Sequence, residues 1–181
     1  SIFLADIYDI FGPRGAQPVF LRGGRLEAAE LRRLRTAQFA EEAGVDMILV
    51  GDSLGMCVYG YAGTVPVTME QCIYHSEAVR RGAPKTFVIG DMPFLSYQVS
   101  VPDAVRNAGR FFKEAEVDAI KLEGGVRIAD KIQAIVEAGI VVMGHIGLTP
   151  QSSGQLGGHK AQGRTAESAK MVVEDARAVR D

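Results

Sequence analysis

Five residues that can carry chemistry stand where apolar runs of the chain end. Asp52 follows the first such run and Asp91 follows the second. Lys121 and Glu123 close the third run, and His145 closes the fourth. If each run is a strand of one parallel sheet, these side chains gather at the carboxyl ends of the strands, where barrel enzymes build their active sites.

The three carboxylates of this set, on Asp52, Asp91 and Glu123, predict a magnesium site. Mg²⁺ prefers hard oxygen ligands and usually keeps several waters, which leaves room for a chelating substrate. Without a cation the grouped carboxylates would repel one another. Taken singly, each could instead be a turn residue or a helix N-cap.

The other polar residues of these strand ends have open roles. Lys121 alternates with apolar neighbours, so it could bind a substrate carboxylate, stabilise an enolate oxygen, form a Schiff base if its pKa were lowered, or make a salt bridge. His145 is either an orienting or proton-transferring group or a hydrogen-bonded core histidine. Ser53 either donates to a substrate carboxylate or caps a helix.

Weaker candidates complete the set. His75 falls in a predicted helix, and His159 lies in a polar, glycine-rich loop, residues 154–163, that either closes over the site or only connects two elements. The loop matches no phosphate-binding fingerprint. We expect Cys57 to serve packing alone.

The elements that must position these residues alternate along the chain. Continuous apolar runs that end at glycine are typical of strands buried on both faces. The predicted strands are Asp46–Val50, Lys85–Ile89, Asp118–Leu122 and Ile140–Met143. The predicted helices are Met69–Gly82 with Thr68 as N-cap, Pro102–Ala115, Ile128–Ala138 and Thr165–Arg180.

The start of the chain is less regular. We predict an irregular segment over residues 1–24, in which Pro18–Arg22 could form a short strand. Arg25–Ala43 predicts a helix, because it is rich in Ala, Leu, Glu and Arg and is followed by Gly44.

This alternation indicates an α/β fold with a parallel sheet in a single domain over residues 1–181. Both a (β/α)8 barrel and a doubly wound open sheet fit the pattern. The chain supplies four clear β/α units and room for a fifth, whereas a full barrel takes about 250 residues.

Composition excludes several classes of protein. The chain is 47% hydrophobic and 23% charged with a net charge of −2, so we expect no nucleic-acid or membrane partner. The two cysteines predict free thiols. No apolar run approaches the ~18 residues of a membrane span, and we expect a cytoplasmic protein.

Several motifs, in order from about Ala40 to Asp181, resemble the ketopantoate hydroxymethyltransferase family. They are the stretches 44–56 (GVDMILVGDSLGM), 66–69 (PVTM), 81–84 (RGAP), 91–94 (DMPF), 121–125 (KLEGG) and 144–151 (GHIGLTPQ), continued by the glycines at 157–158 and by 162–164 (QGR).

This resemblance implies a (β/α)8 TIM barrel of the phosphoenolpyruvate mutase-like superfamily and a homo-oligomer, often a decamer. It implies Mg²⁺ as cofactor and 5,10-methylenetetrahydrofolate as co-substrate, with hydroxymethyl transfer to 2-oxoisovalerate giving ketopantoate for pantothenate biosynthesis. By motif, Asp52, Asp91 and Glu123 bind the metal; Asp52, Ser53, Asp91 and Lys121 bind the oxo acid; Lys121 and His145 are the catalytic candidates.

Two departures from the family shape our expectations. The family begins its barrel with a Thr-Ala-Tyr-Asp strand, but Glu30–Arg33 stands in that place and looks helical. The family's general base is a glutamate on the strand after the last helix, beyond Asp181. We therefore expect about five of eight barrel units and poor activity of this chain alone. A Mg²⁺-dependent lyase or mutase acting on a 2-oxo acid, and a barrel fragment with only a binding role, stay open as alternatives.

Overall fold

The computed structural model describes residues 2–5, 18–21, 24–152 and 162–180. Its sheet has seven strands in the order β1-β7-β6-β5-β4-β3-β2. All neighbours are parallel except β2 and β3. The strands are β1 (Ile2–Ala5), β2 (Pro18–Leu21), β3 (Gly24–Glu30), β4 (Met47–Val50), β5 (Phe87–Asp91), β6 (Ala119–Glu123) and β7 (Val141–Ile146).

Four of the five predicted helices are confirmed to within one or two residues. The helices are α2 (Leu34–Glu42), α3 (Leu54–Cys57), α4 (Met69–Gly82), α5 (Val101–Glu114), α6 (Ala129–Glu137) and α7 (Ala166–Arg180), with 3-10 turns η1 (Val126–Ile128) and η2 (Pro150–Ser152). Thr68 and Gln71 form the capping box that starts α4. This box satisfies two backbone donors that the first turn would otherwise leave unpaired.

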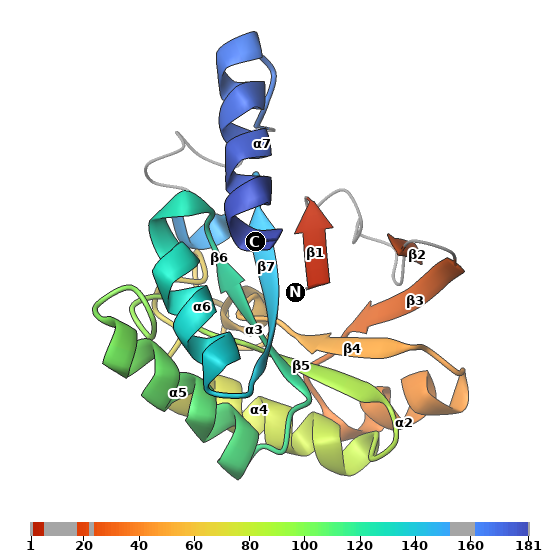
Figure 1. Cartoon of the computed structure of the whole chain (residues 1–181). Coiled ribbons are helices and arrows are strands. Elements are labelled where there is room, and N and C mark those ends of the chain that lie inside the picture. The colour runs from red at the N-terminus through yellow and green to blue at the C-terminus, as the bar shows by residue number, and fades with distance from the viewer. Residues whose placement is uncertain (1, 6–17, 22–23, 153–161, 181) are drawn as a thin grey trace.

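The strand order decides between the two architectures that the sequence allows. Strands β3 to β7 lie side by side in chain order, with no reversal of the kind that divides a doubly wound sheet. Helices α2, α4, α5 and α6 contact one another in the same order and cover one side of the sheet (Figure 1). This arrangement is the curved, one-sided layer of a barrel.

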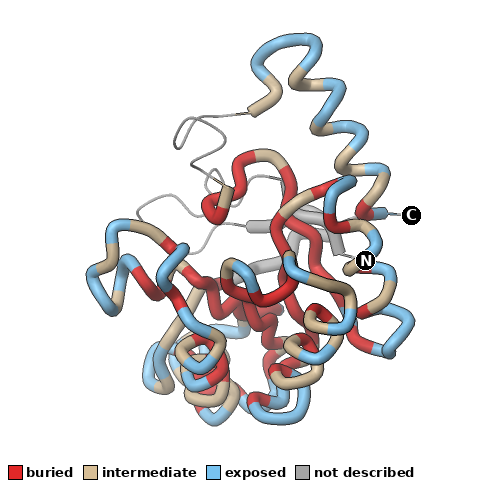
Figure 2. The backbone as a smooth tube through the Cα atoms, turned by 90° about the vertical axis from the view of Figure 1, so that its left-hand side faces the viewer, coloured by how far each residue is buried: buried red, intermediate tan, exposed pale blue. Residues whose placement is uncertain are grey.

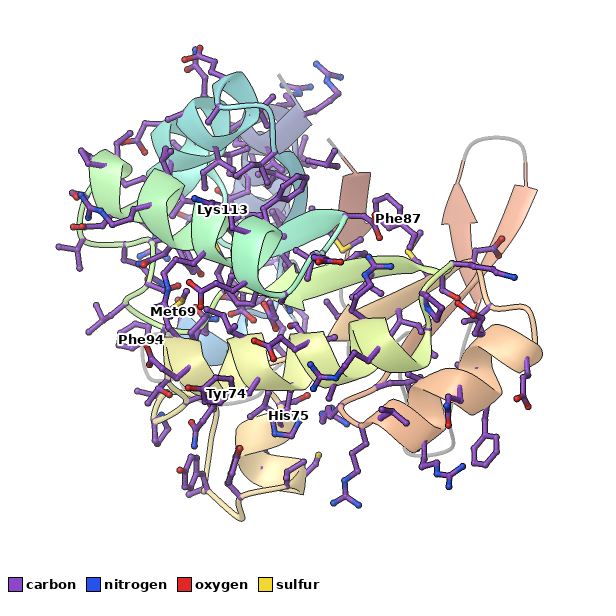
Figure 3. All side chains as sticks on the ribbon, turned by 90° about the horizontal axis from the view of Figure 1, so that it is seen from below. Met69, Tyr74, His75, Phe87, Phe94 and Lys113 are labelled. Atoms are coloured by element: carbon purple, nitrogen blue, oxygen red, sulfur yellow. The ribbon has the colours of Figure 1, made fainter. Side chains whose placement is uncertain are left out.

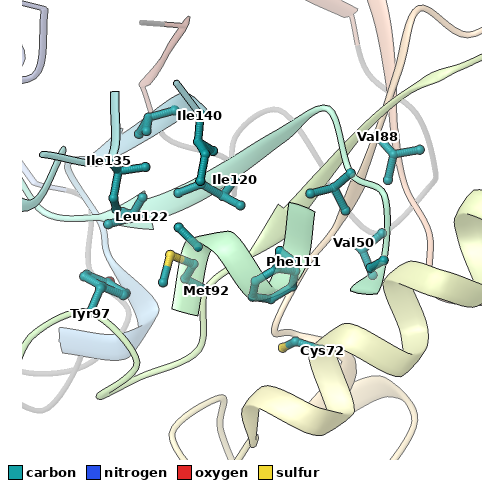
Figure 4. Close-up of a cluster of buried hydrophobic side chains, with 14 of the residues drawn as sticks. Val50, Cys72, Val88, Met92, Tyr97, Phe111, Ile120, Leu122, Ile135 and Ile140 are labelled. Carbon is teal, nitrogen blue, oxygen red and sulfur yellow. The ribbon is translucent and has the colours of Figure 1, made fainter. Parts of the chain in front are cut away.

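Successive side chains of a strand point to opposite faces of the sheet, so the two faces can carry different kinds of residue. Ile120 and Leu122 of β6 face the helices and join a buried cluster with Val88 and Phe111 (Figure 4). Lys121, between them, points to the opposite face and is also buried. The prediction of strands buried on both faces is therefore confirmed.

The predicted helix over Arg25–Ala43 is wrong in its first half. Gly24–Glu30 is strand β3, which pairs with β4 in parallel through Ala28–Met47, Ala29–Ile48 and Glu30–Leu49, and α2 begins only at Leu34. Helix propensity differs by less than ~1 kcal/mol per residue among such residue types, so pairing with a neighbouring strand overrides it.

The predicted irregular segment 1–24 is also corrected in part. It contains strands β1 and β2, and the short strand suggested at Pro18–Arg22 is confirmed over Pro18–Leu21. The rest of that segment lies outside the described residues, apart from Gly24, where β3 begins. β3 lies between β4 and the edge strand β2.

Helix α7 stands above the sheet and is mostly exposed along its length (Figures 1 and 2). Its buried residue Val179 packs on Gly144 of β7, where an added Cβ would meet Val179 Cγ1 at 2.1 Å. Only a glycine permits this approach. In the described part of the chain, no helix combines the length and apolar character needed to cross a membrane.

Candidate active site at the strand ends

The sheet register brings four of the predicted residues together on the inner face. Asp91 of β5 is the register partner of Lys121, and Glu123 is the partner of His145 on β7. Lys121 Nζ lies 2.9 Å from Asp91 Oδ2 and 3.9 Å from Glu123 Oε1. All four residues are at most 5% exposed. Parallel pairing alone thus builds a buried cluster of charges.

The buried Lys121 stays positively charged. Burial by itself lowers the pKa of this amine, but the carboxylates of Asp91, Glu123 and Asp52 raise it above its ordinary value. A nucleophilic amine for a Schiff base needs the opposite shift. The geometry therefore supports the salt bridge and the electrostatic role among the alternatives for Lys121.

Asp52 joins the cluster from the loop after β4. Its backbone N–H donates to Asp91 Oδ2 at 2.9 Å, and its own Oδ2 accepts from Gln151 Nε2 at 2.9 Å. Burial raises the pKa of Asp52 and that of Asp91, against the attraction of Lys121, and repulsion between the carboxylates adds to the rise. Neither aspartate is a simple helix cap.

Glu123 and His145 form the part of the cluster that lies across β6 and β7. His145 is fully buried, and its Nδ1 lies 3.3 Å from Glu123 Oε1. Burial raises the pKa of Glu123, but His145, Lys121 and the backbone N–H of Gln151 lower it below its ordinary value overall. Nε2 of His145 has no hydrogen-bond partner among the described residues, whereas its Nδ1 faces Glu123 Oε1 at ion-pair distance. Both roles expected for His145, in orienting or moving a proton and in the core, therefore stay predictions.

Two residues of the site had no role in the sequence prediction. Gln151 of η2 contacts Asp52 and Glu123, and Tyr97, which lies in the loop between β5 and α5, contacts Gln151 and the backbone of Glu123. Gln151 is the last residue of the motif at 144–151, so the family resemblance could have pointed to it. No sequence signal pointed to Tyr97, because nothing in the local sequence marks a loop tyrosine as buried.

Ser53 occupies a second cluster at the edge of the site. Its hydroxyl contacts the Glu30 carboxylate and the Arg32 guanidinium, which lie 2.5 Å apart. It precedes α3, but its side chain makes no capping hydrogen bond. Arg32 falls in the predicted helix over Arg25–Ala43, but in the structure it precedes α2 and its side chain is only 18% exposed.

The donor set fits a hard divalent cation. Asp91 Oδ1 and Glu123 Oε1 are buried carboxylate oxygens without a hydrogen-bond partner among the described residues. Among those residues, no group of three His, Cys, Asp or Glu side chains is placed so that it could hold a metal ion without further ligands. Oxygen donors that leave several positions to water and substrate suit Mg²⁺.

The weaker candidates lie elsewhere. His75 lies on α4 (Figure 3) and contacts the Tyr59 hydroxyl at 3.1 Å and the Arg32 backbone carbonyl at 2.5 Å. Cys57 is exposed at the end of α3, so its predicted packing role is wrong, while Cys72 is buried; both thiols are free, as predicted. His159 and most of the glycine-rich loop lie outside the described residues.

Comparison with known proteins gives a consistent answer. The model of the family described as ketopantoate hydroxymethyltransferase matches residues 31–181. The 3-methyl-2-oxobutanoate hydroxymethyltransferase of Alkaliphilus metalliredigens is 70% identical over 146 residues, covering 81% of this chain and 52% of the relative. That of Moorella thermoacetica is 54% identical over 158 residues, covering 87% and 59%. The chain thus spans about half the length of the curated relatives it matches.

Solved structures share the fold at low identity. A 2,3-dimethylmalate lyase of the PEP mutase/isocitrate lyase superfamily aligns with a TM-score of 0.59 at 22% identity, covering 85% of this chain and 52% of the lyase. A phosphonopyruvate hydrolase in complex with oxalate and Mg²⁺ aligns with a TM-score of 0.63 at 15% identity, covering 84% and 53%. The expected α/β barrel fold is confirmed, with about half of such a barrel present.

Proposed function

Because this chain belongs to the ketopantoate hydroxymethyltransferase family, we propose that the protein containing it transfers a hydroxymethyl group from 5,10-methylenetetrahydrofolate to 2-oxoisovalerate. The products are ketopantoate and tetrahydrofolate, and the step belongs to pantothenate biosynthesis. The observation that carries the proposal is the buried Lys121 ammonium between Asp91 and Glu123 at the strand ends.

The proposed reaction joins two carbons. A proton leaves the carbon next to the oxo group of 2-oxoisovalerate, and the electron pair of that C–H bond forms the new bond to the one-carbon unit. The one-carbon unit parts from both folate nitrogens, N5 and N10, and water supplies the hydroxyl oxygen. The two nitrogens take up one proton each, one released from the substrate carbon and one from the water. The negative charge that develops meanwhile on the oxo oxygen must be stabilised.

The described residues divide this task. Lys121 holds a fixed positive charge at the site, because Asp91 and Glu123 keep the amine protonated. Ser53 offers a hydroxyl to the substrate carboxylate, and Asp52, Asp91 and Glu123 would hold Mg²⁺. When bound, the cation polarises the oxo group and acidifies the neighbouring C–H bond. We assign no general base among the residues that the structure describes.

The alternatives have weaker support. The lyase and the hydrolase share this fold at 22% and 15% identity, whereas the hydroxymethyltransferase relative is 70% identical. The family resemblance also leads us to propose a homo-oligomer, a decamer, which sedimentation velocity would test.

A transfer assay tests the proposal directly. The intact protein, its mass verified, is incubated with 2-oxoisovalerate, methylenetetrahydrofolate and Mg²⁺, and ketopantoate is measured by mass spectrometry. We expect turnover that EDTA abolishes. Carbon–carbon cleavage of a 2-oxo acid or a related acid without folate would favour the lyase reading. Mg²⁺-dependent binding of the oxo acid without turnover would leave only a binding role.

A further inference from the structure

Gln151 hydrogen-bonds to residues from three strand ends, two of them through its side chain and the third through its backbone N–H. Its Nε2 donates to Asp52 Oδ2 and to the Met92 carbonyl, each at 2.9 Å. Its Oε1 accepts from the Tyr97 hydroxyl at 2.7 Å and from Gln98 Nε2 at 3.2 Å. In addition, its backbone N–H donates to Glu123 Oε2 at 3.0 Å. Every group of the amide therefore has a partner.

These partners fix which way the amide points. If oxygen and nitrogen exchanged places, the Gln151 carbonyl would face the Asp52 carboxylate and the Met92 carbonyl, three acceptors without a donor. The Tyr97 hydroxyl would in turn lose its acceptor on Gln151. Gln151 is only 5% exposed, so water cannot replace the missing bonds, and each unmet buried group would cost about 1–3 kcal/mol.

Tyr97 extends the network to the third carboxylate-bearing strand. Its hydroxyl accepts the backbone N–H of Glu123 at 3.0 Å, and the ring is fully buried. Gln151 and Tyr97 together hold one oxygen of Asp52, one oxygen of Glu123 and the backbone of Glu123. Asp91 is held separately, by Lys121 and by the Asp52 N–H.

We propose that Gln151 is a positioning residue that orients Asp52 and Glu123 for binding of a divalent cation. It engages Oδ2 of Asp52 and Oε2 of Glu123, and Glu123 Oε1 keeps no hydrogen-bond partner in the described part of the chain. One oxygen of each carboxylate is thus held by Gln151, which sets the direction of the other. The inference deepens the proposed function and rests on its cation.

The test measures cation binding itself. Mn²⁺ replaces Mg²⁺ as the probe, and its dissociation constant is obtained from the electron paramagnetic resonance signal of free Mn²⁺ with the intact protein. Gln151→Met keeps the side-chain volume and the backbone donor to Glu123 but removes all four hydrogen bonds of the side-chain amide. Loss of partners that orient metal ligands weakens metal affinity by about 10–100-fold. We expect a weakening in that range.

Tyr97→Phe provides a milder second variant, because it keeps the ring and removes only the hydroxyl that holds Gln151 and Glu123. We expect weaker Mn²⁺ binding, by about half as much on a logarithmic scale as for Gln151→Met. Ser76→Ala is the matched control: it removes a buried hydrogen bond to the Cys72 carbonyl on α4. It should lower the melting temperature and leave the Mn²⁺ dissociation constant unchanged.

Two results would overturn the inference. One is a Gln151→Met protein that melts at a lower temperature but binds Mn²⁺ as tightly as the native protein, which would make Gln151 purely structural. The other is a native protein that binds no Mn²⁺. A native protein that binds Mn²⁺ but transfers no hydroxymethyl group would refute the proposed reaction and leave the positioning role intact.

Discussion

At the scale of a residue, Lys121 shows how burial and attraction compete. A buried ammonium without partners would lose its proton, but this one faces Asp91 at 2.9 Å and Glu123 at 3.9 Å. Such pairs add little net stability over apolar residues, although breaking one by removing a single partner is costly. The arrangement is better explained by the need for a fixed charge at the site than by a need for stability.

Replacing Lys121 by methionine should separate these two effects. Lys121→Met leaves Asp91 buried without its cation, so we expect the free energy of unfolding in urea to fall by about 3–5 kcal/mol. The double variant Lys121→Met/Asp91→Asn should recover most of that loss but no transfer activity. Lys131→Met, which breaks an exposed pair with Asp130, should change stability by less than about 1 kcal/mol. Equal losses in the single and double variants would contradict this account.

At the scale of an element, the packing of α2 on α4 depends on a single glycine. A Cβ added at Gly82 of α4 would lie 2.4 Å from the Leu34 carbonyl oxygen and 3.0 Å from Ala37 Cβ. Both contacts belong to α2, and a backbone oxygen cannot turn away as a flexible side chain would. The distance between the two helices is therefore set by the absence of a side chain.

Replacing glycine by alanine at two helical positions should change the free energy of unfolding in opposite directions. Gly82→Ala should lower the free energy of unfolding by about 1–3 kcal/mol, because the helices must separate. Gly109 of α5 has no atom within 4 Å of an added Cβ. Gly109→Ala should therefore raise stability by about 0.5–1 kcal/mol through helix propensity alone. Thermal or urea unfolding of both variants measures this, and effects of the same sign would refute it.

The hydrogen-bonded contact between the end of α2 and the start of β5 should depend on pH. Glu41 at the end of α2 accepts from the backbone N–H groups of Lys85 and Thr86 at 2.8 and 2.9 Å, just before β5. Its slight burial raises the pKa, but these hydrogen bonds lower it below its ordinary value. A lowered pKa in the folded state means that the ionised group adds stability above the ordinary pKa and loses it as pH falls through the folded one.

Glu41→Gln should therefore destabilise the protein by about 1 kcal/mol at neutral pH. The difference from the native protein should begin to shrink below a pH near 4.5, the ordinary pKa, and be lost at more acidic values. Urea unfolding across this pH range measures it. Glu42→Gln, an exposed neighbour on the same helix, serves as the control, and a difference independent of pH would count against the role of the charge.

At the scale of the whole molecule, the site holds more negative than positive charge. Among the described residues, Asp52, Asp91 and Glu123 share the single lysine Lys121, and burial makes their repulsion costly. A ligand that binds only the folded protein stabilises it by an amount that grows with the logarithm of the ligand concentration above the dissociation constant. Cation binding at the strand ends should therefore be visible as stability of the entire fold.

Mg²⁺ together with 2-oxoisovalerate should raise the melting temperature of the intact protein. At a concentration 100-fold above the dissociation constant the gain is about 2.7 kcal/mol. K⁺ at equal ionic strength should have no comparable effect, and EDTA should reverse the shift. The Asp52→Asn protein should gain less than the native one. Equal shifts with Mg²⁺ and K⁺ would show that the cation acts by screening alone.

The sequence by itself determined the alternation of strands and helices from Asp46 onward, because buried parallel strands and capped helices leave strong local patterns. It also placed Asp52, Asp91, Lys121, Glu123 and His145 at strand ends. It failed at β3, where residues 24–30 have helix-forming composition but pair with β4. Local propensity is weak, so a partner distant in sequence decides such a segment.

Only the tertiary structure decided how these residues act on one another. The register of β5, β6 and β7 sets Lys121 beside Asp91 and Glu123 beside His145. This register also keeps Lys121 positively charged. The sequence left the charge of Lys121 open, because the pKa of a side chain depends on its burial and on its neighbours across strands. Gln151 and Tyr97 gained their roles in the same way: their partners lie 26 to 99 residues away along the chain, beyond the reach of any local pattern.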